Sequence, residues 1–491
     1  MGPQRALGRL RTVSRHALSS SQSSQRLCRT QQKPPTFAFA SARAFHVSLR
    51  RSEENRPLSE AASAVTDHVK TALDQGDSGV AFAFDIDGVL YRGSEAIQGA
   101  AKALRTLRRN GHRYVFLTNG GGVYEDRKAK SLRKKLKLTE EDDVIGDRLI
   151  QSHTPMKGWP EHIKKKDTIL ITGHFPHWAR KIAKSYGFEN IVTPTDIEMA
   201  QNHIYPFLSP RSFKGPGRWN DWQSLPGSKR IFAPDDPYTT EVPGRALKID
   251  HIFVWNDPRD WSLDIQIITD VLSSHKGYLG TVSRKNGDKS LPNNGWQQDD
   301  QPCLWISNLD LHWKTQHPIN RFGTGAFVEA LKGVWRAVTD GVELQYKALG
   351  KPHQVTYEYA HDKLLHMTGS GEHSEATKPL KRVYMIGDNP ESDIAGANSF
   401  SPADGTEWRS ILVRTGVWRP TEMEPEPRHK PDVIVDDVAD AIVWALNREG
   451  IQITRDELLA LGEAEPAKTE PGEEAHEAVT MPSAPVGRIV V

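Results

Sequence analysis

An aspartate pair, Asp85 and Asp87, directly follows the apolar run 79–84 and precedes Gly88. Two carboxylates two residues apart, at about 3.3 Å of rise per residue in an extended chain, can straddle one small group, so that one attacks it while the other donates a proton to the leaving oxygen. Acidic pairs are also common in loops, and taken alone this pair is better explained by a solvated turn. Its place matters, because ligands of open α/β sheets bind outside the carboxyl ends of the strands.

Thr118 and Asn119 follow a second apolar run, 114–117, and lead into the glycines at 120–122. A hydroxyl and flexible backbone amides at such a point suit the oxygens of a phosphate, although a strand-ending turn explains them equally well. Lys351 lies between a glycine and a proline. Its ammonium group could stabilise developing negative charge, but a surface lysine is the simpler interpretation of this residue alone.

Two more acids, Asp388 and Asp393, follow the apolar run 382–386. Either one alone could be a helix N-cap. Together with the first pair they would bring four carboxylates to one edge of a sheet, where they would repel strongly unless a divalent cation lay among them. All-oxygen ligation suits Mg²⁺. The sequence therefore predicts a magnesium site.

Short apolar segments predict the strands that carry these residues. Near-continuous apolar runs are typical of strands buried on both faces of a parallel sheet, and they occur at 79–84, 114–117, 382–386, 411–413 and 433–435. Apolar residues at helical spacing predict a helix over 97–109, between the first two strands. Strand, helix and strand form a βαβ unit, so we expect an α/β fold with a Rossmann-like, doubly wound parallel sheet.

A long stretch between the second and third motifs has strands of its own, predicted at 168–171 and 251–255. It is too long for a loop and indicates an inserted domain. Segments 208–245, 284–302 and 367–380 are polar or rich in proline and glycine, and we expect surface insertions there. The sequence does not indicate their role.

The ordered series Asp-x-Asp-Gly, Thr-Asn, Lys-Pro and Gly-Asp-x-x-x-x-Asp resembles the four motifs of the haloacid dehalogenase (HAD) superfamily. The insert between the second and third motifs resembles the class IIA members, among them phosphatases of 4-nitrophenyl phosphate, phosphoglycolate and nucleotides, and implies an α/β cap domain of class IIA (C2) type. Segments 152–155 and 256–261 are similar to a narrower group, the mitochondrial cat eye syndrome critical region family. The resemblance covers about 78–447.

This resemblance implies a role for each motif residue. Asp85 would be the nucleophile that becomes a phosphoaspartate. Asp87 would protonate the leaving alcohol and then deprotonate the hydrolytic water. Thr118 would hydrogen-bond a phosphoryl oxygen, and Lys351 would neutralise charge on Asp85 and on the phosphate.

The metal ligands follow from the same resemblance. Mg²⁺ would be held by the Asp85 and Asp388 carboxylates and by the Asp87 carbonyl, where it would remove the repulsion between nucleophile and phosphate. Asp393 would support the waters of the metal or position Lys351.

The leaving group would be recognised by other residues. We expect Asn119 and Gly120 to bind substrate beside the phosphate, and Asn308 and Asp310 to bind it from the insert, just past the apolar run 303–306. Asp310 could instead cap a turn and fix the hinge between insert and core.

Composition indicates where the protein acts. Segment 1–52 contains ten basic residues and no acid, as in mitochondrial transit peptides, although a disordered basic tail is the alternative. The remaining chain has 54 basic and 62 acidic residues, which does not support nucleic-acid binding. No run of eighteen apolar residues occurs, so no membrane span is predicted.

The predicted protein is a mitochondrial, matrix-located, Mg²⁺-dependent phosphatase of a small phosphorylated metabolite, with a possible homodimer through the cap. The alternatives are a phosphotransferase with the same residues, for example one of glycerophospholipid metabolism, and a non-catalytic binding or scaffold protein of the same fold. The predicted division of the chain is a transit peptide at 1–52, a lead-in segment at 53–77, core at 78–155, cap at 156–315, core at 316–447, and a short helix with a disordered acidic tail at 448–491.

Overall fold

The computed structural model describes residues 79–139, 142, 144–207, 222–367 and 379–463. The predicted transit peptide, the lead-in segment and the acidic tail beyond Glu463 lie outside the described residues, as do parts of two of the predicted surface insertions. No helix in the described part of the chain has the length and apolar character needed to cross a membrane.

A six-stranded parallel sheet carries the first, second and fourth motifs, with the strand order β15-β14-β13-β1-β4-β5. Its strands are β1 (Val80–Phe84), β4 (Arg113–Thr118), β5 (Leu149–Gln151), β13 (Arg382–Gly387), β14 (Glu407–Val413) and β15 (Val433–Val435). All five predicted strands are confirmed. The short β5 was not predicted, because only three of its residues are in the strand.

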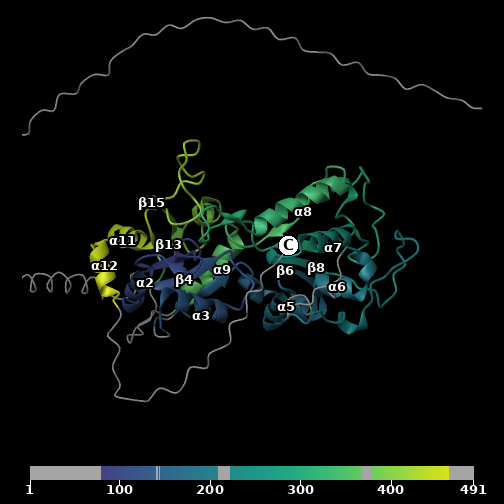
Figure 1. The fold of residues 1–491 in the computed structure, drawn as a ribbon, viewed down its shortest axis with the longest axis horizontal. Helices are drawn as coiled ribbons and strands as arrows, with labels where there is room; N and C mark the ends of the chain where they lie inside the picture. The colour runs from purple at the N-terminus through teal and green to yellow at the C-terminus, as the bar shows by residue number, and fades with distance from the viewer. Residues whose placement is uncertain (1–78, 140–141, 143, 208–221, 368–378, 464–491) are drawn as a thin grey trace, which may run out of the picture. The chain divides into compact units, whose positions relative to one another are not determined.

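The side chains of β1 explain why helices cover both faces of this sheet. Phe82 and Phe84 point into one apolar cluster, whereas Ala81 and Ala83 point into the other. The larger cluster takes in helices α2 (Ala100–Arg109), α3 (Glu125–Leu136), α11 (Val438–Arg448) and α12 (Arg455–Leu461). The other takes in α9 (Gln354–His366) and α10 (Ala395–Ser399). This arrangement confirms the doubly wound α/β fold (Figure 1).

A second, five-stranded parallel sheet has the order β12-β9-β8-β6-β7. Its strands are β6 (Thr168–His174), β7 (Asn190–Val192), β8 (His251–Pro258), β9 (Cys303–Ile306) and β12 (Lys347–Ala348). Figure 1 shows its helices beside it, α5 (Pro176–Ser185), α6 (Pro194–Ala200), α7 (Trp261–Ser273) and α8 (Thr324–Val338).

This second layer continues beyond the predicted end of the insert at residue 315. Phe327, Leu331 and Trp335 of α8 are buried with residues of β8 and β9 in one apolar cluster, and β12 pairs with β9. The third motif at Lys351 therefore follows directly from a strand of the second sheet.

Short elements complete the described chain. They are β2 (Tyr91–Arg92) paired with β3 (Glu95–Ala96), β10 (His312–Trp313) paired with β11 (Arg321–Phe322), α4 (Glu161–Lys166), and the single turns η2 (Gly146–Arg148), η3 (Thr154–Gly158), η4 (Asn202–Ile204), η6 (Pro226–Ser228), η7 (Pro292–Gly295) and η8 (Pro390–Ile394).

Candidate active site

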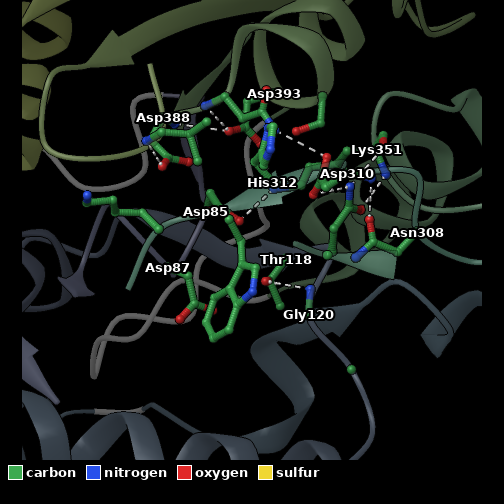
Figure 2. A pocket seen from close by; sticks show the side chains of 18 of the residues that line it. Asp85, Asp87, Thr118, Gly120, Asn308, Asp310, His312, Lys351, Asp388 and Asp393 are labelled. Atoms are coloured by element: carbon green, nitrogen blue, oxygen red, sulfur yellow. Dashed lines mark hydrogen bonds and ion pairs between the residues drawn. The ribbon is translucent and has the colours of Figure 1, made fainter. Parts of the chain in front are cut away.

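The register of the first sheet brings the motifs together. Phe84, the last residue of β1, pairs with Ile386 of β13 and with Phe116 of β4, so the three strands end at the same edge. Asp85, Thr118 and Asp388 therefore emerge side by side, and they line one cavity of about 260 Å³ together with Lys351. Figure 2 shows these side chains converging.

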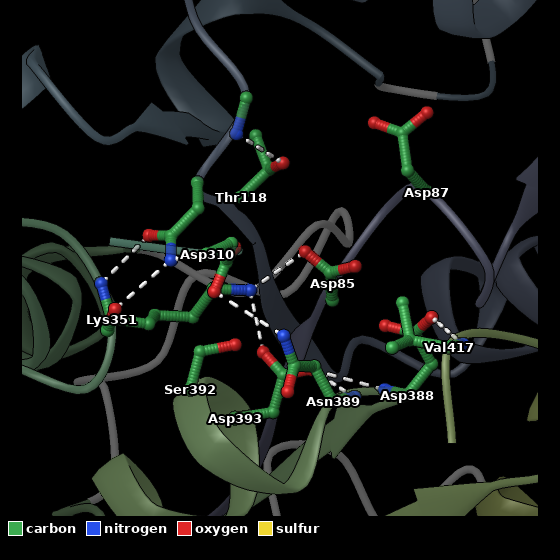
Figure 3. Close-up of polar contacts among 12 residues, drawn as sticks. Asp85, Asp87, Thr118, Asp310, Lys351, Asp388, Asn389, Ser392, Asp393 and Val417 are labelled. Carbon is green, nitrogen blue, oxygen red and sulfur yellow. Dashed lines mark hydrogen bonds and ion pairs between the residues drawn. The ribbon is translucent and has the colours of Figure 1, made fainter. Parts of the chain in front are cut away.

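Lys351 lies at the centre of this arrangement. Its Nζ is 2.6 Å from Asp85 Oδ1 and 2.6 Å from Asp393 Oδ1 (Figure 3), and its side chain is only 1% exposed. Burial lowers the pKa of Lys351, but the charges of Asp393 and Asp85 outweigh it and hold this pKa above its ordinary value. The surface-lysine alternative is therefore wrong, because this ammonium group is buried and bonded to the proposed nucleophile.

Three buried carboxylates, of Asp85, Asp388 and Asp393, form the acid cluster, and one oxygen of each lies within 4.8 Å of the other two. Burial raises the pKa of Asp85 to about 7, although Lys351 opposes this effect. Burial and then the charges of Asp85 and Asp393 raise the pKa of Asp388 well above its ordinary range. One ammonium group is not enough to balance three such acids, so the cluster has the character of a cation site.

Backbone N–H groups fix two of these carboxylates. The N–H groups of Asp388 and Asn389 both donate to Asp393 Oδ2 at 3.0 Å, and the N–H of Val417 donates to Asp388 Oδ2 at 2.7 Å. The loop at Gly416 passes so close to Asp388 that only glycine fits, because a Cβ at this position would lie 1.7 Å from Asp388 Oδ2. Main-chain groups thus position Asp388 and Asp393, and the side chain of Lys351 holds Asp393 and Asp85.

Asp87 lies apart from the acid cluster and is half-buried (Figure 3). Its Oδ2 is 3.5 Å from Lys128 Nζ. Thr118 Oγ1 accepts a hydrogen bond of 3.0 Å from the N–H of Gly120, which leaves its own O–H free to donate. A Cβ at Gly120 would lie 3.8 Å from both Asp87 Oδ2 and Lys128 Nζ, so this loop passes close to both groups.

The side chain of Asn119 bonds with protein atoms on both sides. Its Oδ1 accepts from the Lys351 N–H at 2.7 Å, and its Nδ2 donates to the Lys351 carbonyl at 2.9 Å and to Asp310 Oδ2 at 3.0 Å. We predicted that Asn119 binds substrate. Asn119 lines the cavity and its amide holds the Lys351 backbone in place, so substrate binding by Asn119 stays a prediction.

Asp310 connects the end of the insert to the core. Its carboxylate accepts from Nδ2 of Asn119 and from Nδ2 of Asn389 at 3.2 Å, and Asn308 Oδ1 accepts from the Asp310 N–H at 2.7 Å. Burial raises the pKa of Asp310 to about 6, opposed by Lys351. Both residues line the cavity. Their bonds match the hinge-fixing alternative more closely than substrate binding.

A buried hydrogen-bond chain supports the glycine loop after β4. The Gly122 N–H donates to His153 Nε2 at 3.2 Å, and His153 Nδ1 lies 2.9 Å from the Tyr186 hydroxyl, which donates to Glu125 Oε1 at 2.6 Å. Since Nε2 accepts, the ring proton is on Nδ1. Burial lowers the pKa of His153 to about 4, so the ring is neutral.

The sequence reasoning missed the basic side chains of the cavity, Lys128, Lys135 and Lys314. Lys128 and Lys135 are seven residues apart on α3, a spacing that puts both on one face of a helix. That spacing was a usable signal, but the basic sequence of α3 also suits a solvated helix. Nothing in the sequence around Lys314 marks it as part of the site.

Comparisons with known proteins agree with the fold and the motifs. Residues 82–189 match the family described as haloacid dehalogenase-like hydrolase, and residues 348–441 match that described as HAD-hydrolase-like. A mitochondrial hydrolase of Saccharomyces cerevisiae is 37% identical over 385 residues, covering 75% of this chain and 96% of the relative.

Two further proteins are similar over a comparable part of this chain. A fusion of cardiolipin synthase (CMP-forming) and mitochondrial hydrolase from Schizosaccharomyces pombe is 33% identical over 375 residues, 75% of this chain and 53% of the fusion. A solved structure described as a possible sugar phosphatase of Cytophaga hutchinsonii is 17% identical, with a TM-score of 0.46, over 76% of this chain and 97% of that one. By its similarity to the Saccharomyces hydrolase and its two matched segments, the chain belongs to the haloacid dehalogenase-like hydrolase family.

Proposed function

We propose that this protein is a mitochondrial, Mg²⁺-dependent phosphatase that hydrolyses a small phosphomonoester through a phosphoaspartate on Asp85. The observation that carries this proposal is the buried contact of 2.6 Å between Asp85 Oδ1 and Lys351 Nζ, beside the carboxylates of Asp388 and Asp393. A nucleophilic carboxylate needs a cation nearby to approach an anionic phosphate, and this contact provides one.

Each side chain of the site has a separate role in the proposed reaction. Asp85 attacks phosphorus, and the bond to the leaving alcohol breaks. Asp87, which stands apart from the acid cluster, gives its proton to the leaving oxygen and later takes one from the attacking water. Thr118 donates its free O–H to a phosphoryl oxygen, and the ammonium group of Lys351 stabilises negative charge on Asp85 and on the phosphate.

The acid cluster fits a divalent cation. Its oxygens are all carboxylate, they are buried, and burial with mutual repulsion raises the pKa of Asp85 and of Asp388, which a bound cation would offset. Mg²⁺ would be held by the carboxylates of Asp85 and Asp388 and the carbonyl of Asp87, and would supply positive charge between nucleophile and phosphate. Asp393 accepts two backbone N–H groups and pairs with Lys351, which supports a positioning role.

The mitochondrial location is supported by two observations. Two relatives that match over long stretches are named mitochondrial hydrolases, one of them in a fusion, and residues 1–52 have the composition of a transit peptide. A fluorescent protein fused to the full chain should enter mitochondria, and deletion of residues 1–52 should leave it in the cytosol. Cytosolic fluorescence of the full-length fusion would contradict the assignment.

Phosphate release tests the activity. The purified chain without residues 1–52 should release phosphate from 4-nitrophenyl phosphate and from members of a panel of phosphorylated metabolites when Mg²⁺ is present. Excess chelator should abolish the release, and Asp87→Asn should slow alkyl phosphates more than 4-nitrophenyl phosphate, whose leaving group needs less acid assistance. Undiminished release in excess chelator would remove the metal from the mechanism.

A further inference from the structure

The cavity at Asp85 has a basic end that none of the four motifs supplies. Lys128 and Lys135 reach it from α3 of the core, and Lys314 reaches it from the segment after β10. We call these three residues the lysine cluster. They line the same cavity as the acid cluster, so a molecule bound at Asp85 meets them with its leaving group.

Lys128 is the member of the lysine cluster with an acidic partner. Its Nζ is 3.1 Å from the Tyr91 hydroxyl and 3.5 Å from Asp87 Oδ2. Burial lowers the pKa of Lys128, but Asp87 and Tyr91 outweigh it and raise this pKa above its ordinary value. Lys128 is therefore a fixed cation that neutralises Asp87.

Lys135 has no such partner. Its Nζ lies 3.6 Å from the centroid of the Tyr91 ring, and within residues 79–139, 142, 144–207, 222–367 and 379–463 it forms no ion pair with a carboxylate. A cation–π contact is weaker than an ion pair. Burial lowers the pKa of Lys135; the charge of Asp87 opposes this effect and the charge of Lys128 adds to it. Because the net direction is downward, the ammonium group gains from an anion that enters the cavity.

Lys314, in the segment after β10, resembles Lys135 because it has no acidic partner within the described chain. Its Nζ donates to the carbonyls of His317 at 3.3 Å and Pro318 at 3.0 Å, and the residue is only 5% exposed. Burial and then the charges of Arg419 and Arg92 lower its pKa, because nearby positive charges repel the ammonium group.

The acids that line the cavity outside the acid cluster already have partners. Asp87 faces Lys128, Asp257 Oδ1 accepts from the Thr324 hydroxyl at 2.9 Å, and Asp310 accepts from the amides of two asparagines. The acid cluster and Lys351 belong to the phosphoryl group. Lys135 and Lys314 are thus the cations of the cavity that the protein leaves for a ligand.

We propose that the substrate's leaving group carries an anionic group of its own, such as a second phosphate, a phosphodiester or a carboxylate, and that Lys135 and Lys314 bind it. This inference rests on the proposed phosphatase function and names the substrate class of that site. It also extends recognition of the leaving group beyond Asn308 and Asp310 of the insert to helix α3 of the core.

Binding of non-hydrolysable phosphonates tests this class directly. Titration calorimetry in Mg²⁺ should show α,ω-alkylene diphosphonates of three to five carbons binding wild-type protein at least about tenfold tighter than the matching alkyl monophosphonates, a difference of about 1.4 kcal/mol. Matching ω-carboxy phosphonates and diphosphonates with one group as its methyl ester distinguish a carboxylate or a phosphodiester from a second phosphate.

The variants then assign the preference to residues. Lys135→Gln and Lys314→Gln should each reduce the diphosphonate preference severalfold, and the double variant should abolish it. Lys135→Arg keeps the positive charge and should therefore retain the preference. The matched control is Lys134→Gln, which removes the same charge from an exposed neighbour on α3 and should keep the preference.

Two results would overturn the proposal. One is equal affinity of wild-type protein for mono- and diphosphonates at every chain length. The other is a preference that survives in the double variant while its melting temperature equals that of wild type. Phosphonates are not turned over, so these outcomes are independent of phosphate release, whose absence would instead contradict the proposed function.

Discussion

The two ends of the cavity are built in different ways. In the acid cluster, Asp85 and Asp388 sit on the first residues after β1 and β13, and backbone N–H groups hold Asp388 and Asp393. In the lysine cluster, long side chains reach in from α3 and from the segment after β10. Backbone N–H groups hold two carboxylates of the acid cluster, whereas the lysine cluster depends on where long side chains are placed.

This difference separates chemistry from recognition. Main-chain positioning leaves the carboxylates little freedom, which suits a reaction that needs one fixed geometry for the phosphoryl group. Lysine stems with rotatable bonds can meet anions at several distances. We therefore expect single substitutions to have large effects on turnover at the acid cluster and smaller, substrate-dependent effects at the lysine cluster.

The largest effect is expected for Asp85→Asn. The change keeps the volume of the side chain but removes the nucleophile, so kcat for 4-nitrophenyl phosphate should fall by a factor on the order of 10³ or more. Asp340→Asn, at an exposed position after α8, is the control and should be fully active. Substantial activity in Asp85→Asn would break the comparison, because the acid cluster would not be the reacting end.

A second prediction concerns the cation that the acid cluster fits. Mg²⁺ at 100 times its dissociation constant should stabilise wild-type protein by about 2.7 kcal/mol, seen as a raised melting temperature. Asp388→Asn should lose this response. Without metal the variant should be at least as stable as wild type, because it removes one of three buried, mutually repelling carboxylates.

The opposite result would be informative. If Asp388→Asn kept the full response to Mg²⁺, or if metal-free wild-type protein were clearly the more stable of the two, the acid cluster would be a self-sufficient network and not a cation site.

The same difference between the acid cluster and the lysine cluster explains which site residues could be predicted from the sequence. Asp85, Thr118 and Asp388 were recognised because each directly follows an apolar run, and the position of a residue relative to a strand end is encoded locally. All five predicted strands of the first sheet occur. The meeting of Lys351 with Asp85 could be inferred only from the order of the motifs, since 266 residues separate the two in the chain.

What the sequence left out depends on tertiary packing. Lys135 enters the cavity because its helix packs beside Tyr91, and in the sequence only its spacing of seven residues from Lys128 distinguishes it from the exposed Lys134. Asn119 was assigned to substrate because it follows a strand end, yet its amide is taken up by Lys351 and Asp310. The type of a residue determines its chemistry, but its bonding partners come from chain segments that are far away in the sequence.

A third, smaller effect is expected for Asp310→Ala. The change leaves Nδ2 of Asn389 without its partly buried acceptor, which costs about 1 kcal/mol. If Asp310 fixes the hinge, the melting temperature should fall and kcat/KM should fall equally for 4-nitrophenyl phosphate and for an anionic metabolite phosphate. A loss confined to the metabolite, at unchanged melting temperature, would add Asp310 to the recognition end.

The last effect is expected at the glycine loop after β4, and it depends on pH. His153 accepts from the Gly122 N–H and is neutral in the folded protein, with a pKa of about 4, whereas an unfolded histidine titrates near 6.5. Below pH 6.5 the unfolded chain therefore binds a proton that the folded one does not, so stability is lost as the pH falls toward 4. At pH 5 this loss is about 2 kcal/mol.

His153→Gln can still accept from Gly122 but does not titrate, so the melting-temperature advantage of wild type over this variant should shrink from pH 7 to pH 5. His162→Gln, an exposed histidine of α4, controls for general acid effects and should track wild type throughout. An unchanged difference between wild type and His153→Gln would mean that His153 is charged in the folded state beside Glu125, and the glycine loop would then rest on an ion pair.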